Sequence, residues 1–196
     1  MSVANPRSVG LLTALTYIRI ALVPVVMVLI ALGDEMRFAY GIAAALFVVA
    51  ALTDFFDGKL ARKWGAVTSL GAFLDTTADK LLVTGVLIAL VAEDRASIWV
   101  ATIIIGRELM IMGLRALIAA DGTVLKPSIW GKLKAKVQFV AITLAIIRWP
   151  LDIGPLLLDE WAMLIAAGIT VLSGIEYLSR FSHLLTVSGG GAEGDS

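Results

Sequence analysis

Cysteine is absent from the 196-residue sequence, which excludes disulfide bonds, a thiolate nucleophile and cysteine-ligated zinc. No charge of one sign dominates, because 16 Lys and Arg residues balance 16 Asp and Glu residues. The composition therefore gives no reason to expect nucleic acid as a partner. Charged residues make up only 16% of the chain, whereas hydrophobic residues make up 59%. This hydrophobic share exceeds that of ordinary soluble domains and predicts a protein embedded in a lipid bilayer.

Six apolar segments each approach the ~20 residues that cross the hydrocarbon core of a membrane as a helix. They cover residues 12–32, 39–53, 69–92, 97–119, 137–153 and 161–179. The second and fifth segments reach full length by extending as helices into the polar sequence beside them. We therefore predict an all-α membrane protein with six transmembrane helices in a single domain, residues 1–187, followed by a disordered Gly-rich tail at residues 188–196.

The basic residues between the apolar segments and near their ends are shared unequally between the two sides of the membrane. Nine of them fall on the side of both termini, and three fall on the other side. The nine are Arg7, Lys59, Arg62, Lys63, Lys126, Lys132, Lys134, Lys136 and Arg180, and the three are Arg37, Arg95 and Arg148. Because Lys and Arg favour the cytoplasmic side, we predict a multi-pass protein of the cell (inner) membrane with both termini in the cytoplasm.

Four aspartates lie at the edges of the second and third segments, where charge is costly to place in lipid. Asp54 and Asp57 are three residues apart and Asp75 and Asp79 are four apart, so each pair lies on one face of its helix. The two segments are expected to form an antiparallel hairpin that turns on the cytoplasmic side and brings the pairs together. Hard divalent cations that prefer oxygen ligands, Mg²⁺ or Mn²⁺, would neutralise such a group. The alternative is ordinary ion pairing with nearby cations, namely Lys59, Arg62 and Lys80.

The residues around these aspartates form a longer pattern. The run Asp54-Phe55-Phe56-Asp57-Gly58-Lys59-Leu60-Ala61-Arg62 is followed, after eight residues, by Gly71-Ala72-Phe73-Leu74-Asp75-Thr76-Thr77-Ala78-Asp79. This pattern resembles the signature of the CDP-alcohol phosphotransferase family, the phosphatidyltransferases, and agrees with it at all eight fixed positions. The resemblance implies an enzyme that moves the phosphatidyl group of a CDP-linked lipid onto an alcohol and releases CMP.

The resemblance also assigns roles to these residues. It implies that Asp54, Asp57, Asp75 and Asp79 hold Mg²⁺ or Mn²⁺, as two ions, on the pyrophosphate of the lipid, and that Asp79 is the catalytic general base. It places the nucleotide against Asp54, Gly58, Ala61, Arg62 and Gly71. Small residues allow a nucleotide to approach the helix backbone closely, although they suit close helix packing as well. An arginine can bind a phosphate through its forked donors.

Further short motifs resemble those of bacterial phosphatidylglycerophosphate synthases. They are Thr16-x-x-Arg19, Gly106-Arg107-Glu108, Gly113-Leu114-Arg115 and Gly131-Lys132-Leu133-Lys134 with Gln138. This resemblance implies CDP-diacylglycerol and glycerol 3-phosphate as substrates, and a homodimer. The phosphate of glycerol 3-phosphate needs a basic pocket, for which the candidates are Arg107, Lys132 and Lys134.

Other interpretations of these basic residues stay open. Arg107 could pair with Glu108, and the lysines could contact anionic lipid. Arg19 and Arg115 are expected to be structural, or to reach the membrane interface by snorkelling. The sequence departs from the family at Leu12-Thr13, where Pro-Asn is usual, and at Ala135, where Thr is usual. These departures leave room for another acceptor, such as phosphatidylglycerol in cardiolipin synthesis or an inositol phosphate.

Proteins of two other classes would also place carboxylates within membrane helices. A small ion-coupled transporter is one, but the sequence has no clear internal repeat or pair of broken spans, and its acids cluster on one side of the membrane. A purely structural membrane scaffold is the other, and it leaves the eight-position match unexplained.

Overall fold

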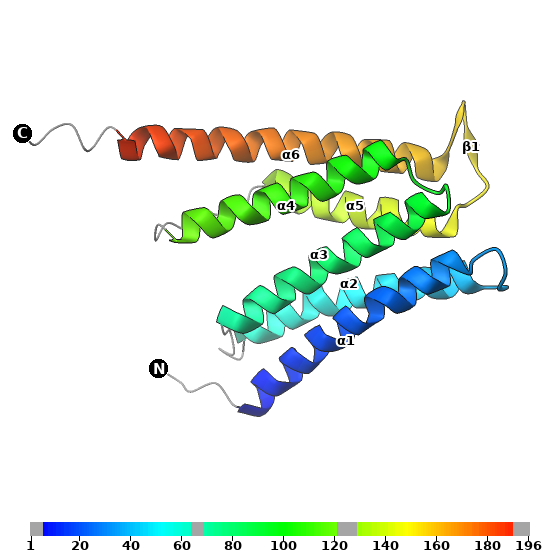
Figure 1. Cartoon of the computed structure of the whole chain (residues 1–196), viewed down its shortest axis with the longest axis horizontal. Coiled ribbons are helices and arrows are strands. Elements are labelled where there is room, and N and C mark those ends of the chain that lie inside the picture. Colours follow the sequence, from blue (N-terminus) through cyan, green and yellow to red (C-terminus); the bar gives the residue numbers. More distant parts are fainter. Residues whose placement is uncertain (1–5, 64–68, 121–128, 190–196) are drawn as a thin grey trace, which may run out of the picture.

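The computed structural model describes the backbone of residues 6–63, 69–120 and 129–189, and the side chains of these residues except 6–9, 11–12, 54–63, 69–70, 72, 120, 129, 132 and 181–189. The described part contains six helices, as predicted (Figure 1). These are α1 (Pro6–Ala31), α2 (Ala39–Lys63), α3 (Ser69–Ala92), α4 (Ile98–Ala120), α5 (Ile129–Ile147) and α6 (Leu158–Gly189). A short hairpin of β1 (Asp152–Ile153) and β2 (Leu156–Leu157) precedes α6.

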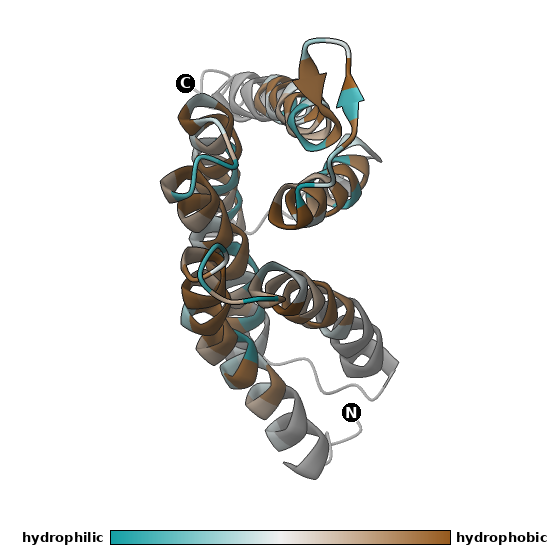
Figure 2. Ribbon diagram, turned by 90° about the vertical axis from the view of Figure 1, so that its right-hand side faces the viewer, coloured by the Kyte–Doolittle hydropathy of each residue, from teal (hydrophilic) through white to brown (hydrophobic). Residues whose placement is uncertain are grey.

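The helices run back and forth between two ends of the molecule (Figure 1). We call one of them the loop end, because it carries the connections at residues 32–38 and 93–97 and the β1–β2 hairpin. The start of α1, the end of α6, the end of α2 and the start of α3 lie at the other, which we call the site end. Figure 2, viewed from the loop end, shows hydrophobic residues along the helices and hydrophilic residues concentrated in the connections.

A continuous apolar core joins all six helices of the described part. Each helix contributes at least one fully buried side chain, for example Val26, Phe47, Leu87, Ile104, Ile142 and Ala166. Gly85 allows α3 to approach α1 closely, because a Cβ atom at this position would lie 2.7 Å from Cγ1 of Val23. Small residues at helix contacts are typical of helices that pack in a membrane.

The fifth helix differs from its predicted bounds. It begins at Ile129 and ends at Ile147, whereas the sequence predicted residues 137–153. The lysine-rich start is helical, since lysine is a good helix former and Lys134 is buried against α4. The helix stops because Arg148 has a positive φ of 49°, and Pro150, which cannot donate an N–H, follows. A turn at Gly154, with φ 67°, then closes the β1–β2 hairpin.

The outer helices are longer than the apolar segments predicted. The first begins at Pro6, and the last continues to Gly189, into the tail expected from residue 188. Residues 190–196 of that expected tail lie outside the described part of the chain. The second helix extends beyond its apolar segment to Lys63. This extension was predicted because the apolar segment alone is too short to cross a membrane.

Two described stretches are long and apolar enough to cross a membrane by length and composition, Thr13–Ala31 and Leu158–Arg180. A third, Ala39–Thr53, is apolar but shorter. The remaining helices, α3, α4 and α5, carry the charged side chains of the candidate site, among them Asp79, Glu108 and Lys134. The number of charged residues in α3 and α4, and not a lack of apolar residues, separates them from the two long apolar stretches.

Candidate active site

Two of the four motif aspartates lie on one face of α3, as their spacing predicts. The Asp75 carboxylate accepts a hydrogen bond from Nη1 of Arg19 on α1, at 2.9 Å. The Asp79 carboxylate accepts one from Nζ of Lys80, at 2.7 Å. Both aspartates are more than one-third exposed, so their oxygens remain accessible beside these cations.

The other motif residues are on the last turns of α2. The backbone of this helix is continuous to Lys63, which places Asp54, Asp57, Gly58 and Ala61 in helical register near the start of α3. The side chains of these residues and of Arg62 lie outside the described part. Gly71 lies on α3, one turn before Asp75.

The donor set suits a hard divalent cation. Asp75 and Asp79 offer carboxylate oxygens one helical turn apart, and hard divalent ions prefer such ligands. No group of three or more acidic or histidine side chains that could hold a metal occurs among the described side chains, and two of the four predicted ligands, Asp54 and Asp57, are not in that set.

A buried glutamate organises the charged side chains next to the aspartates. Glu108 on α4 is only 4% exposed. Its Oε2 lies 2.8 Å from Nζ of Lys80, and its Oε1 accepts hydrogen bonds from Lys134 on α5 and, at 3.3 Å, from Nη1 of Arg107. Lys80 therefore bridges the carboxylates of Asp79 and Glu108.

Arg107 is also fixed from α6. Its Nη2 donates a hydrogen bond to Oγ of Ser173 at 2.7 Å. The aliphatic part of its side chain passes over Gly174, where an added Cβ atom would lie 3.5 Å from Cγ of Arg107. The arginine thus connects α4 to α6, and its side chain is only 12% exposed.

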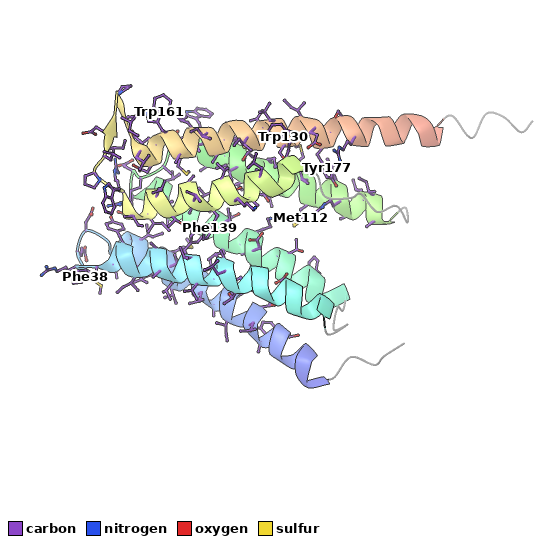
Figure 3. The ribbon with its side chains drawn as sticks, turned by 180° about the vertical axis from the view of Figure 1, so that it is seen from behind. Phe38, Met112, Trp130, Phe139, Trp161 and Tyr177 are labelled. Carbon is purple, nitrogen blue, oxygen red and sulfur yellow. The ribbon has the colours of Figure 1, made fainter. Side chains whose placement is uncertain are left out.

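Two cavities meet at this cluster. The larger, of about 580 Å³, lies between α3, α4, α5 and α6, and its charged lining consists of Lys80, Arg107, Glu108, Arg115 and Lys134. The smaller, of about 300 Å³, lies between α2, α3 and α5 and has a mostly apolar lining, with Asp79, Lys80, Glu108 and Lys134 at its polar part. In Figure 3, Met112 and Tyr177, which line the larger cavity, lie on the side of Trp130, away from Phe38 and Trp161 at the loop end.

The three residues predicted to bind an acceptor phosphate have different outcomes. Arg107 and Lys134 do line one cavity together, although they also pair with Glu108, as the alternative interpretation of Arg107 proposed. The side chain of Lys132 lies outside the described part. Whether these residues bind a phosphate stays a prediction.

Some residues have a larger part in the site than the sequence indicated. Of the two roles expected for Arg19, the structural one agrees with the structure and the interfacial one does not, because its side chain is 2% exposed and paired with Asp75 inside the bundle. Arg115 lines the larger cavity, and Lys80 belongs to both. Ser173 had no signal in the sequence at all. For Glu108 the signal was an acid within an apolar segment, which is costly to keep without a partner.

The sequence of this chain matches that of a known class of transferase. The sequence profile of the CDP-alcohol phosphatidyltransferase family matches residues 11–172. The chain is therefore a member of this family, and the resemblance drawn from the aspartate motif is confirmed. Membership of a family of membrane-associated transferases decides against the ion-coupled transporter and the structural scaffold.

Several bacterial relatives narrow the comparison. A protein of Bacillus subtilis (strain 168) named CDP-diacylglycerol–glycerol-3-phosphate 3-phosphatidyltransferase is 37% identical over 89% of this chain and 96% of its own length. A probable phosphatidylglycerophosphate synthase of Mycobacterium tuberculosis (strain ATCC 25618 / H37Rv) is 38% identical over 89% of this chain and 82% of its own. A Pseudomonas fluorescens protein with the same name as the Bacillus one is 35% identical over 88% of this chain and 90% of its own.

Proposed function

We propose that this chain transfers the phosphatidyl group of CDP-diacylglycerol to glycerol 3-phosphate, with release of CMP, in phospholipid biosynthesis. The names of its relatives support both substrates. The observation that carries the proposal is the position of Asp79: its neighbour Lys80 belongs to the larger cavity, which also contains Arg107, Arg115 and Lys134. A candidate base therefore stands beside a pocket suited to a phosphate-bearing alcohol.

The acceptor would bind with its phosphate among these cations and its hydroxyl towards Asp79. The hydroxyl oxygen forms a bond to the lipid-side phosphorus, the bond from that phosphorus to the bridging oxygen of the pyrophosphate breaks, and CMP leaves with that oxygen. An oxygen of Asp79 takes the proton of the hydroxyl group. Positioning and charge neutralisation account for most of the catalysis in such transfers, and the cluster of charged side chains supplies both.

The metal would be held by Asp54, Asp57, Asp75 and Asp79, as Mg²⁺ or Mn²⁺ and as two ions. When bound, it neutralises charge on the oxygens of the pyrophosphate. The accessible oxygens of Asp75 and Asp79 support this assignment. The nucleotide would be bound by the residues that the family resemblance implies, namely Asp54, Gly58, Ala61, Arg62 and Gly71.

The smaller cavity suits the lipid donor. Apolar side chains of α2, α3 and α5 line most of it, including Phe47 and Phe139, whose rings stack with centroids 5.4 Å apart. An acyl chain in this apolar space would leave the adjoining pyrophosphate near Asp79.

We further propose that all six helices cross the inner membrane, with both termini and the active site on the cytoplasmic side, and that the enzyme is a homodimer. The common location of the start of α1 and the end of α6 supports an even number of crossings (Figure 1). The tryptophans exposed at the loop end, Trp99, Trp149 and Trp161, suit the opposite interface. The dimer rests on the family resemblance alone, and the mass of the detergent-purified protein, corrected for bound detergent, tests it.

One experiment decides the acceptor. Detergent-purified protein is given CDP-diacylglycerol and Mg²⁺, and CMP release is measured with glycerol 3-phosphate, phosphatidylglycerol, inositol phosphate, inositol or serine. We expect release with glycerol 3-phosphate and little with the others. Release with phosphatidylglycerol or inositol phosphate instead would reassign the acceptor within the family, and no release with any acceptor would refute the proposal.

A further inference from the structure

The charges around Glu108 are unbalanced in a way that favours a second anion. Three cations from three helices, Lys80, Arg107 and Lys134, all pair with this one carboxylate. Because Lys80 also pairs with Asp79, the three cations face two carboxylates, which leaves an excess of one positive charge. All four side chains line the larger cavity. Each ammonium group has three N–H donors and the guanidinium has five, so the cations can bind Glu108 and another anion at once.

Ser173 contributes to the same cluster without adding charge. Its hydroxyl accepts the hydrogen bond from Nη2 of Arg107, while Glu108 accepts the one from Nη1. Because the guanidinium is planar and its donors have fixed directions, these two acceptors determine how the group is presented to the cavity. Ser173 is 1% exposed and lines neither cavity, so it acts from behind the lining, whereas Glu108, at 4% exposed, belongs to the lining itself.

We propose that Glu108 and Ser173 are positioning residues for the acceptor, which hold the three cations where its phosphate binds. This inference rests on the proposed function, and it assigns roles to two residues outside the aspartate motif. An opposing interpretation exists, in which Glu108 is only a counter-charge. Its removal would then raise the positive potential of the cavity and strengthen the binding of anions.

Two substitutions test whether Glu108 and Ser173 position the cations, as opposed to setting the net charge of the cavity. Glu108→Asp keeps the carboxylate but shortens its reach, and Ser173→Ala removes a neutral hydroxyl. Neither changes the net charge of the cavity. We expect the KM for glycerol 3-phosphate to rise about tenfold in Glu108→Asp and about three- to tenfold in Ser173→Ala. The KM for CDP-diacylglycerol should stay within about twofold in Ser173→Ala, because Ser173 does not line the smaller cavity, where the lipid is proposed to bind. In Glu108→Asp it should rise less than the KM for glycerol 3-phosphate, since Glu108 lines both cavities.

A matched control is available on α6. Thr170 is fully buried, and its hydroxyl donates to the carbonyl of Ala166 on its own helix at 2.6 Å. Thr170→Val therefore removes a buried hydroxyl one turn from Ser173 without touching the cations. It should leave the KM for both substrates unchanged. A rise in the acceptor KM equal to that of Ser173→Ala would overturn the inference, because any loss of packing in α6 would then explain it.

Binding of inorganic phosphate to the detergent-purified protein, measured by calorimetry, distinguishes this inference from the acceptor assignment. If the wild type does not use glycerol 3-phosphate, the proposed function fails, but weaker phosphate binding in Glu108→Asp and Ser173→Ala would still support the positioning role. Unchanged phosphate binding and acceptor KM in both variants would overturn it, as would tighter binding in Glu108→Gln with no change in Glu108→Asp. Should Glu108→Asp fail to fold, Ser173→Ala decides alone.

Discussion

Replacement of Arg107 by Ala should weaken the use of glycerol 3-phosphate much more than the binding of CDP-diacylglycerol. The side chain is only 12% exposed, so a contact with a phosphate would be weakly screened by solvent. A hydrogen bond to a charged group contributes about 1.5–3 kcal/mol. At about 1.4 kcal/mol per tenfold change, the loss is about one to two orders of magnitude in acceptor efficiency. Lys80 and Lys134 remain in the cavity, which favours the lower part of this range.

The assay is a titration of glycerol 3-phosphate at saturating CDP-diacylglycerol. Arg107→Lys, which keeps the charge but loses the forked donors, should fall between the wild type and Arg107→Ala. Arg180→Ala is the matched control, because Arg180 is also an arginine of the helical bundle but pairs with Glu176 and lines neither cavity. Unchanged acceptor kinetics in both Arg107→Ala and the Lys132→Ala, Lys134→Ala double variant would refute this pocket and reopen the choice of acceptor.

Other predictions concern the aspartates and the packing of α1. Chelation should abolish turnover, and Mg²⁺ or Mn²⁺ should restore it. Asp57→Asn should lose at least two orders of magnitude in rate, about 2.7 kcal/mol of transition-state stabilisation. Near-normal activity of this variant would contradict a metal role for Asp57. Asp79→Asn should retain binding of CDP-diacylglycerol while losing turnover; loss of both metal and lipid binding would make Asp79 chiefly a ligand. Gly85→Ala should lower the apparent Tm by a few degrees. Overpacking against Val23 costs about 1–3 kcal/mol, which exceeds the gain of about 0.5–1 kcal/mol from replacing a helical glycine. A second change in the same protein, Val23→Ala, should restore the Tm.

The helices and the α3 aspartates could be predicted because their signals are local. Apolar length gives the helices, and a spacing of four residues places Asp75 and Asp79 on one face whatever lies beyond them. The end of α5 was less predictable. The stretch after Ile147 still has apolar residues at Trp149, Leu151 and Ile153, within the predicted segment, yet the positive φ of Arg148 and the missing N–H of Pro150 end the helix before the hairpin.

The ionic partners could not be predicted, because they depend on how distant segments pack. Arg19 and Asp75 are 56 residues apart, and Lys134 and Glu108 are 26 apart. The sequence shows only that each is an ionisable residue in or beside an apolar segment. Lys134 in particular is one of three lysines at alternate positions, and nothing local indicates that it, rather than Lys136, faces Glu108.

The contacts at the two ends of the bundle differ in kind, and this difference bears on catalysis. At the loop end, the Arg95 guanidinium lies 3.4 Å from the ring centroid of Tyr40 and donates to the carbonyl oxygen of Ile146 at 3.1 Å, so it joins α2 to α5 through neutral groups. Its ion pair with the exposed Asp34 is longer, at 3.8 Å. Nearer the site end, Lys80 and Arg107 bind carboxylates that leave donors free for a substrate phosphate. Contacts with neutral groups hold the helices without a substrate, whereas contacts between ions can be shared with one. The loop end and the apolar core therefore hold the fold, which leaves the charged groups beside Asp79 available for the reaction.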